Sequence, residues 1–340
     1  MSFPKNSRLS VCVLLGLTIA YGAANAQTTN LDAIQVNAGP VVEVEEPTAP
    51  VKITSDQIQK TQSHDVMRVL KQAPGVYVRE EDGLGLRPNI GLRGTNPDRS
   101  KKIVLMQDGA PIAPAPYSAP AAYYTPSLGF TDSLNIYKGF SSAIYGPNSI
   151  GGAINYITTP IPDQWTTETE LSGGSFSSWN SNVLTGGSTS WGGAFLQVER
   201  RQSSGFKELD TGGDTGFVQN RLLGKLRFHL PSKDFRAHFV DLRVGYGDEN
   251  SNETYLGLAQ SDFEKTPYRR YAASQRDEMT WDHQTYQMEH NYQLSQTGIL
   301  ETTLYRHEFH RVWDKFARFR KENLNVREVL DDPDGSNELF

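Results

Sequence analysis

Two glycine-rich stretches decide the fold of this chain. The first reads Asn89-Ile-Gly-Leu-Arg-Gly-Thr-Asn-Pro-Asp-Arg-Ser-Lys-Lys-Ile-Val-Leu-Met-Gln-Asp-Gly109, and the second reads Asn135-Ile-Tyr-Lys-Gly-Phe-Ser-Ser-Ala-Ile-Tyr-Gly-Pro-Asn-Ser-Ile-Gly-Gly-Ala-Ile-Asn-Tyr-Ile-Thr158. Each places a short β-branched run, 103–106 or 153–157, beside glycines that permit sharp turns of the backbone. This order predicts strand, turn and strand within a compact domain.

The residues before these stretches predict the opening of the same domain. Thr54 or Ser55 can cap a short helix, and Ser63 can cap a second helix that ends at Ala73-Pro-Gly75. A strand is expected at 76–78, directly after the Pro-Gly break.

Helix, Pro-Gly break, Val-rich strand and the two glycine-rich stretches together resemble the plug domain of TonB-dependent outer-membrane receptors. The neighbouring residues are most similar to the ferric dicitrate receptor branch, and the resemblance covers about residues 32–274. It implies an α+β plug domain over residues 51–163, followed by antiparallel transmembrane β-barrel strands. It also implies a receptor, not an enzyme, in the outer membrane of a Gram-negative bacterium.

The N-terminus predicts export. Lys5 and Arg8 precede an apolar run at 11–20, and Ala24-Asn-Ala26 is a small-residue cleavage site, so residues 1–26 are expected to be a signal peptide. The only cysteine, Cys12, lies inside this segment. The exported chain therefore has no thiol for catalysis, zinc binding or disulfides.

Residues 27–50 form a flexible tail without helical or strand periodicity. Within it, a five-residue segment resembles the TonB box, the site at which the periplasmic partner TonB and its inner-membrane motor grip these receptors: Asp32, Ala33, Ile34, Gln35 and Val36. A flexible segment with β-branched residues can add as a strand to the sheet edge of a partner.

Composition excludes two classes of protein. A formal net charge of −6 argues against a nucleic-acid binder. No apolar run after the signal peptide is long enough for a membrane helix, whereas barrel strands hide their apolar residues at alternate positions.

Alternation of apolar and polar residues predicts about seven strands, at 165–174, 179–188, 193–202, 218–230, 240–246, 286–294 and 299–312. A soluble β-sandwich is the alternative, but strand length, export and the preceding domain favour a barrel wall in contact with lipid. A 22-stranded plugged barrel needs far more chain than residues 164–340. We therefore expect the N-terminal part of an incomplete, truncated barrel.

Two groups of residues are candidates for binding a ferric chelate. Tyr117, Tyr123 and Tyr124 lie in a proline-rich loop that either meets the ligand or packs beneath the barrel. Arg269 and Arg270, in the longest loop (248–282), offer guanidinium forks to carboxylates. The alternative for these arginines is surface pairing with Asp262, Glu264 or Asp277.

Other polar residues suggest structural roles. Arg93 resembles a plug arginine that pairs with barrel carboxylates, and Lys138 stands where the family typically has a second arginine. We expect both to help seat the plug, with their carboxylate partners beyond the strands of this chain. His307 and His310 would point to opposite faces of a strand, so we expect no metal site there. No motif predicts a catalytic residue or a covalently bound cofactor.

The sequence therefore predicts a receptor that imports an iron(III) chelate, such as ferric citrate or a related siderophore, when TonB pulls on the tail. A non-transporting outer-membrane adhesin or structural barrel is the main alternative. A secreted β-rich enzyme, which would be released from the membrane fraction, is a third.

Overall fold

The structure of the chain is a computed structural model. The described residues are 50–112, 123–139, 142, 145–146, 149–232, 237–254, 256–295, 297–318 and 325–331. The predicted signal peptide, the predicted TonB box and Tyr117 lie outside them.

The domain that the sequence predicts to be a plug, called the plug below, is built on a five-stranded sheet with the strand order β1-β6-β7-β4-β5. Strands β4 and β7 are parallel, and their other pairings in the sheet are antiparallel. The sheet strands are β1 (Val51–Ile53), β4 (Ile103–Gln107), β5 (Ala110–Pro111), β6 (Thr131–Lys138) and β7 (Gly152–Thr158). The strands predicted within the two glycine-rich stretches are thus confirmed as β4 and β7.

The remaining plug elements surround this sheet. Strand β2 pairs with β3 in a separate two-stranded sheet, which confirms the strand predicted after the Pro-Gly break. These elements are α1 (Ser55–Thr61), α2 (Val66–Leu70), β2 (Val76–Arg79), β3 (Asn89–Leu92) and the 3-10 turns η1 (Asp98–Ser100) and η2 (Leu128–Phe130).

Side chains cap both helices. The Thr54 hydroxyl accepts from the Gln57 N–H, and the Gln57 side chain accepts from the Thr54 N–H at 2.9 Å, which forms a capping box at α1. At α2 the predicted cap was wrong, because Asp65 and not Ser63 accepts from the Met67 N–H, at 2.8 Å. Ser63 instead accepts from the Asp65 N–H. A carboxylate two residues closer to the first turn takes the capping position.

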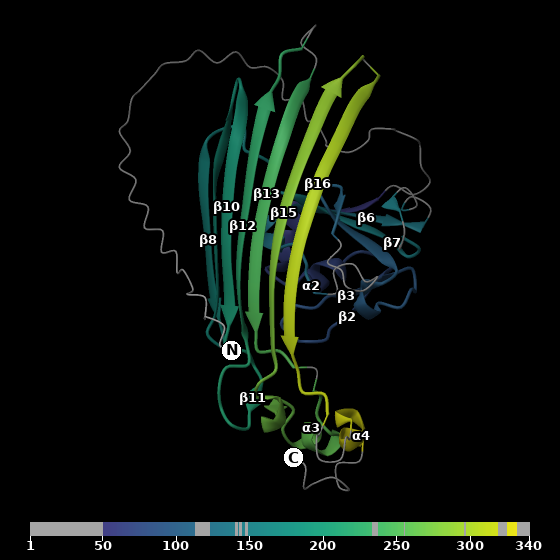
Figure 1. Ribbon diagram of the computed structural model, residues 1–340, viewed down its shortest axis with the longest axis vertical. Coiled ribbons are helices and arrows are strands. Elements are labelled where there is room, and N and C mark those ends of the chain that lie inside the picture. The colour runs from purple at the N-terminus through teal and green to yellow at the C-terminus, as the bar shows by residue number, and fades with distance from the viewer. Residues whose placement is uncertain are drawn as a thin grey trace, which may run out of the picture. The chain divides into compact units, whose positions relative to one another are not determined.

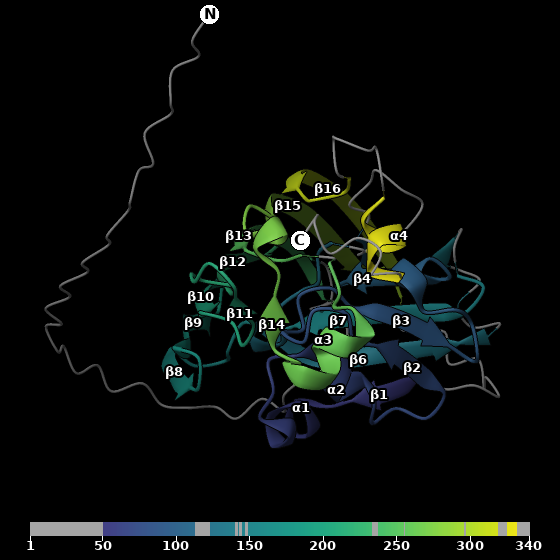
Figure 2. The ribbon, with the colours of Figure 1, turned by 90° about the horizontal axis from the view of Figure 1, so that it is seen from below.

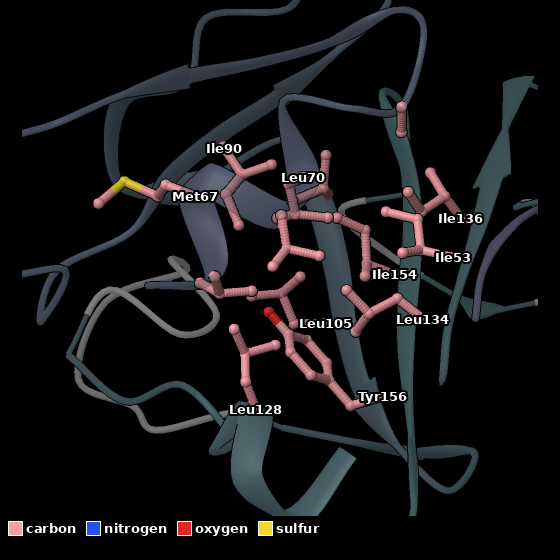
Figure 3. Packing of buried hydrophobic residues seen from close by; sticks show 14 of the residues in the cluster. Ile53, Met67, Leu70, Ile90, Leu105, Leu128, Leu134, Ile136, Ile154 and Tyr156 are labelled. Carbon is pink, nitrogen blue, oxygen red and sulfur yellow. The ribbon is translucent and has the colours of Figure 1, made fainter. Parts of the chain in front are cut away.

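One hydrophobic core lies between α2 and the sheet (Figure 3). Leu70, Leu105, Ile154 and Tyr156 are all 0% exposed. Gly152, in the second glycine-rich stretch, lies beside this core with φ +145°. A Cβ at this position would lie 2.3 Å from the Tyr137 carbonyl oxygen, so only glycine fits.

A long antiparallel sheet follows the plug, with the order β16-β15-β13-β12-β10-β9-β8 (Figure 1). The seven predicted strands are confirmed as β8 (Thr166–Gly174), β9 (Ser178–Thr189), β10 (Gly192–Ser203), β12 (Phe217–His229), β13 (His238–Ser251), β15 (Glu278–Gln293) and β16 (Ile299–Asp314). The two faces of this sheet differ as the alternation predicted. On β13, Val244 and Tyr246 are 45% and 43% exposed, whereas Arg243 and Glu249 are buried.

Two long connections, 204–216 and 252–277, leave the same end of the long sheet. We call this the long-loop end. The second connection is shorter than the predicted loop 248–282, because β13 and β15 extend further than the apolar residues alone indicated. Near this end lie β11 (Glu208–Leu209), β14 (Arg269–Arg270), α3 (Gln260–Lys265), the 3-10 turn η5 (Ala272–Ser274) and α4 (Val326–Asp331) (Figures 1 and 2). No helix in the described part of the chain is long and apolar enough to cross a membrane.

Candidate functional site: the contact between plug and long sheet

The plug lies against one face of the long sheet (Figure 2), and Arg87 is its most buried charged contact. The segment before Arg87 is folded around the Asp82 carboxylate, which accepts the backbone N–H groups of Leu84 (2.6 Å), Leu86 (3.1 Å) and Arg87 (2.7 Å). A carboxylate satisfied by backbone donors fixes this turn and so positions the arginine.

The Arg87 side chain, 1% exposed, reaches two acidic residues. Its Nη2 donates to Glu249 Oε1 at 2.5 Å and to Ser251 Oγ at 3.1 Å, and its Nη1 donates to Glu249 Oε2 at 3.3 Å. Glu253, at the start of loop 252–277, places Oε2 2.9 Å from the same Nη2. Burial alone would lower the pKa of Arg87, but the two carboxylates outweigh burial and raise it.

A second anchor lies on β13 nearer the opposite end of the long sheet. Asp108 has φ +46° in the turn between β4 and β5, and its carboxylate accepts from the Thr158 N–H (2.8 Å) and hydroxyl (2.5 Å). Arg243 pairs with this carboxylate and also hydrogen-bonds Gln287, whose Nε2 donates to the Asp108 carbonyl at 2.9 Å. Burial alone would raise the pKa of Asp108, but Arg243 and Lys225 lower it below its usual value.

Polar side chains of the long sheet also hold the plug backbone. Lys225 donates to the Thr159 carbonyl at 2.7 Å, and Gln197 and Asn182 donate to the Gly129 carbonyl at 2.7 and 3.1 Å. The plug is therefore attached through many directed polar contacts, although small apolar clusters also join it to the sheet.

Comparison with known proteins identifies this arrangement. Residues 43–153 match the model of the TonB-dependent Receptor Plug Domain. Residues 43–153 are a TonB-dependent receptor plug domain. Over 299 residues the chain is 27% identical to the vitamin B12 transporter BtuB of Vibrio vulnificus (strain YJ016), covering 82% of this chain and 48% of that protein. The chain therefore spans about half the length of this curated relative.

Solved receptor structures share the fold. The unliganded ferric citrate transporter FecA matches with TM-score 0.68 at 21% identity, covering 79% of this chain and 41% of that one. The ferric yersiniabactin uptake receptor FyuA from Yersinia pestis matches with TM-score 0.62 at 17% identity, covering 79% and 42%. The fold is thus a plug domain followed by antiparallel strands like those of the receptor barrels.

The receptor buries the two described tyrosines of the predicted ligand loop. Tyr123 and Tyr124 are 6% and 8% exposed. For these two residues the structure agrees with the alternative in which the loop packs beneath the barrel. Tyr124 makes an edge contact with Trp281, with ring centroids 5.3 Å apart. The Arg311 guanidinium lies over the Tyr123 ring, 3.8 Å from its centroid.

Arg269 and Arg270 of the receptor are both engaged within its long loops. Arg269 forms a two-pronged pair with Asp210 (2.9 and 3.1 Å) and an ion pair with Asp262 (3.2 Å). Arg270 is 4% exposed and donates to backbone carbonyls, including Ser274 O at 2.6 Å. Surface pairing with Asp262 was one of the predicted alternatives, whereas Asp210 was not foreseen.

Arg93, which the sequence predicts to seat the plug, takes no part in the Arg87 and Asp108 contacts with the long sheet. Arg93 is exposed, with φ +53° and its guanidinium close to Gly139, and Lys138 donates to the Pro74 carbonyl within the plug. Pairing of these cations with carboxylates beyond the described strands stays a prediction. The sequence analysis did not predict the contact of Arg87 with the long sheet. The glycine-rich acidic segment before Arg87 was a signal for it, because that segment forms the turn around Asp82 that positions the arginine.

The two histidines on β16 point to opposite faces, as predicted. His307 stacks on His283 on the plug side, whereas His310 lies 3.4 Å from Asp282 on the other face. Among the described residues of the receptor, no three His, Cys, Asp or Glu side chains are grouped to hold a metal ion.

Proposed function

We propose that this receptor imports an anionic iron(III) chelate, with ferric citrate or a related siderophore as the ligand, and that TonB opens it by pulling on residues 32–36. The observation that carries this proposal is the directed polar attachment of the plug, through Arg87 and Asp108, to the long sheet. Such contacts hold a separately folded domain in place without fusing it into one continuous apolar core.

A basic and aromatic region on the plug side supports an anionic ligand. Arg311 lies near the long-loop end of β16, and its Nη1 is buried without a hydrogen-bond partner among the described residues. Arg99 of the plug lies over the same Tyr123 ring, 5.8 Å from its centroid. Guanidinium groups beside aromatic rings suit carboxylates carried on a bulky chelate.

The names of similar proteins support the chelate class. Two solved relatives are named for the transport of ferric citrate and ferric yersiniabactin, and the curated relative is named for vitamin B12. We favour the iron chelate over the cobalamin because unpaired cationic donors such as Arg311 Nη1 match carboxylates.

Uptake of radioactive ferric citrate by cells with the full-length receptor tests this proposal. Ile34→Pro removes a backbone donor that strand addition needs, so we expect uptake to stop while chelate binding persists. Ile34→Val is the matched control and should retain uptake. Binding without any TonB-dependent uptake in the unaltered receptor would favour the adhesin alternative.

A further inference from the structure

Arg87 is the point at which three parts of the receptor meet. Arg87 belongs to the plug, Glu249 to β13, and Glu253 to loop 252–277. All three side chains are at least nine-tenths buried, with exposures of 1%, 0% and 6%. A change at this cluster therefore acts on the plug and on a loop at the long-loop end together.

The terminal nitrogens of Arg87 donate hydrogen bonds to Glu249 but not to Glu253 Oε2. Each terminal nitrogen of a guanidinium carries two hydrogens. Those of Nη1 go to the Leu86 carbonyl and to Glu249, and those of Nη2 go to Glu249 and to Ser251. Glu253 Oε2 is 2.9 Å from Nη2, yet it accepts no hydrogen bond from any described residue. Charge attraction alone therefore supports the ionised form of Glu253 at this contact.

The charged groups that face Glu253 do not offset the cost of burying its ionised carboxylate. They are Glu81, Asp82 and Arg87 of the plug, Glu249 of β13, Lys207 of loop 204–216 and Arg270 of its own loop. Burial, reinforced by the carboxylates of Asp82, Glu249 and Glu81 and only partly opposed by Arg87, raises the pKa of Glu253 to about 7. By contrast, Glu249 accepts hydrogen bonds from Arg87 and, at 2.6 Å, from Gln219.

We propose that Glu253 is a proton-controlled latch, which docks loop 252–277 on the plug when it is protonated and loosens that loop when it is ionised. The docked carboxyl, with its pKa raised from 4.5 to about 7, binds a proton more tightly than the same carboxyl on a free loop. Docking is therefore weakest above pH 7 and strengthens as the pH falls from 7 toward 4.5.

The latch is independent of the ligand, because it needs only the plug, β13 and the loop. Between about pH 8 and about pH 6, these two pKa values change the equilibrium between docked and loose loop roughly tenfold. Glu253→Gln keeps the shape of the neutral carboxyl and removes the titration. This variant should hold the loop docked at both pH values.

The test uses the full-length receptor in liposomes with a nitroxide spin label at Phe263, which is 54% exposed on α3 of the same loop. We expect the ratio of immobile to mobile label signal to fall about tenfold from pH 6 to pH 8, and Glu253→Gln to abolish this change. Glu264→Gln, an exposed carboxyl of the same loop, is the matched control and should retain the change.

A second measurement reports the proton directly. In infrared difference spectra between about pH 6 and about pH 8, the C=O band of protonated carboxyls that is lost as the pH rises should be weaker in Glu253→Gln than in the unaltered receptor. A spin-label response that persists in Glu253→Gln, its absence from the unaltered receptor, or a C=O band of equal size in the two proteins would overturn the latch. Neither measurement contains a chelate, so failure of the latch is distinguishable from failure of iron uptake.

Discussion

Asp108 of the plug and Arg243 of β13 form an ion pair across the contact between the plug and the long sheet, with side chains 17% and 6% exposed. Each partner is also held by its own domain, Asp108 by Thr158 and Arg243 by Gln287. The pair thus joins two pre-organised groups, so little conformational entropy is lost when it forms.

Asp108→Asn should weaken this anchor strongly. It removes the charge that compensates Arg243, and loss of one partner from a buried pair costs about 3–5 kcal/mol. The measurement is the free energy of unfolding of the receptor plug by denaturant. Asp163→Asn, an exposed aspartate after the plug sheet, is the control. A loss no larger than in this control would contradict an anchoring role for Asp108.

The stability given by Asp108 should also depend on pH. Because its pKa lies below the usual 3.8, this contribution is fully present above pH 3.8 and is lost as the pH falls through the lowered value. Unfolding free energies measured from about pH 5 down to about pH 2 should show this acid limb in the unaltered receptor and a flatter one in Asp108→Asn. Equal slopes in the two proteins would show that Asp108 is not coupled to folding.

Arg87 should tolerate neither loss of charge nor loss of shape. Arg87→Ala leaves Glu249 buried without its cation and should cost about 3–5 kcal/mol of plug stability. Arg87→Lys keeps the charge but cannot form the two-pronged contact, so its cost should be intermediate. The same denaturant measurement applies, with Arg79→Ala as control, because Arg79 pairs with Asp98 at a half-exposed position. That surface pair should contribute only about 0–1 kcal/mol.

Gly152→Ala tests the packing of the second glycine-rich stretch. The added Cβ would meet the Tyr137 carbonyl at 2.3 Å, and φ +145° is unfavourable for alanine. We expect a loss of at least about 1–3 kcal/mol in plug stability. Gly174→Ala, where a Cβ meets no atom within 4 Å, should change little. Similar effects at the two glycines would mean that backbone crowding does not explain Gly152.

Sequence alone predicted the strands better than their contacts. Alternation identified the face of Val244 and Tyr246 because that pattern is local, with a period of two. The pairing of Arg87 with Glu249 joins residues 162 positions apart, and no local pattern specifies such a register. The β13 boundary at Ser251 was also missed, since its last residues are polar on both faces and pair with β15 nonetheless.

The ligand residues were predicted by type but not by place. Arginine beside tyrosine was expected in the long loop predicted at 248–282, where Arg269 instead pairs with Asp210. The same chemistry occurs on β16, where Arg311 faces Tyr123 of the plug. Which arginine has unused donors depends on every acid that the fold brings near, and this is a property of the folded chain.

Arg311 provides the last prediction, on ligand binding. If its unpaired Nη1 donates a hydrogen bond to a carboxylate of ferric citrate, then Arg311→Ala should weaken binding about 10- to 100-fold, as expected for a charge-assisted hydrogen bond of about 1.5–3 kcal/mol. Arg306→Ala, on the opposite face of the same strand, is the matched control and should bind normally. Equilibrium binding of radioactive ferric citrate to the full-length receptor measures both. Because Arg311 also packs on Tyr123, the unfolding free energy of each variant must be measured in parallel. Unchanged affinity in a stably folded Arg311→Ala would show that this arginine does not bind the chelate. The proposal that the ligand is anionic would then lose the observation on which it mainly rests.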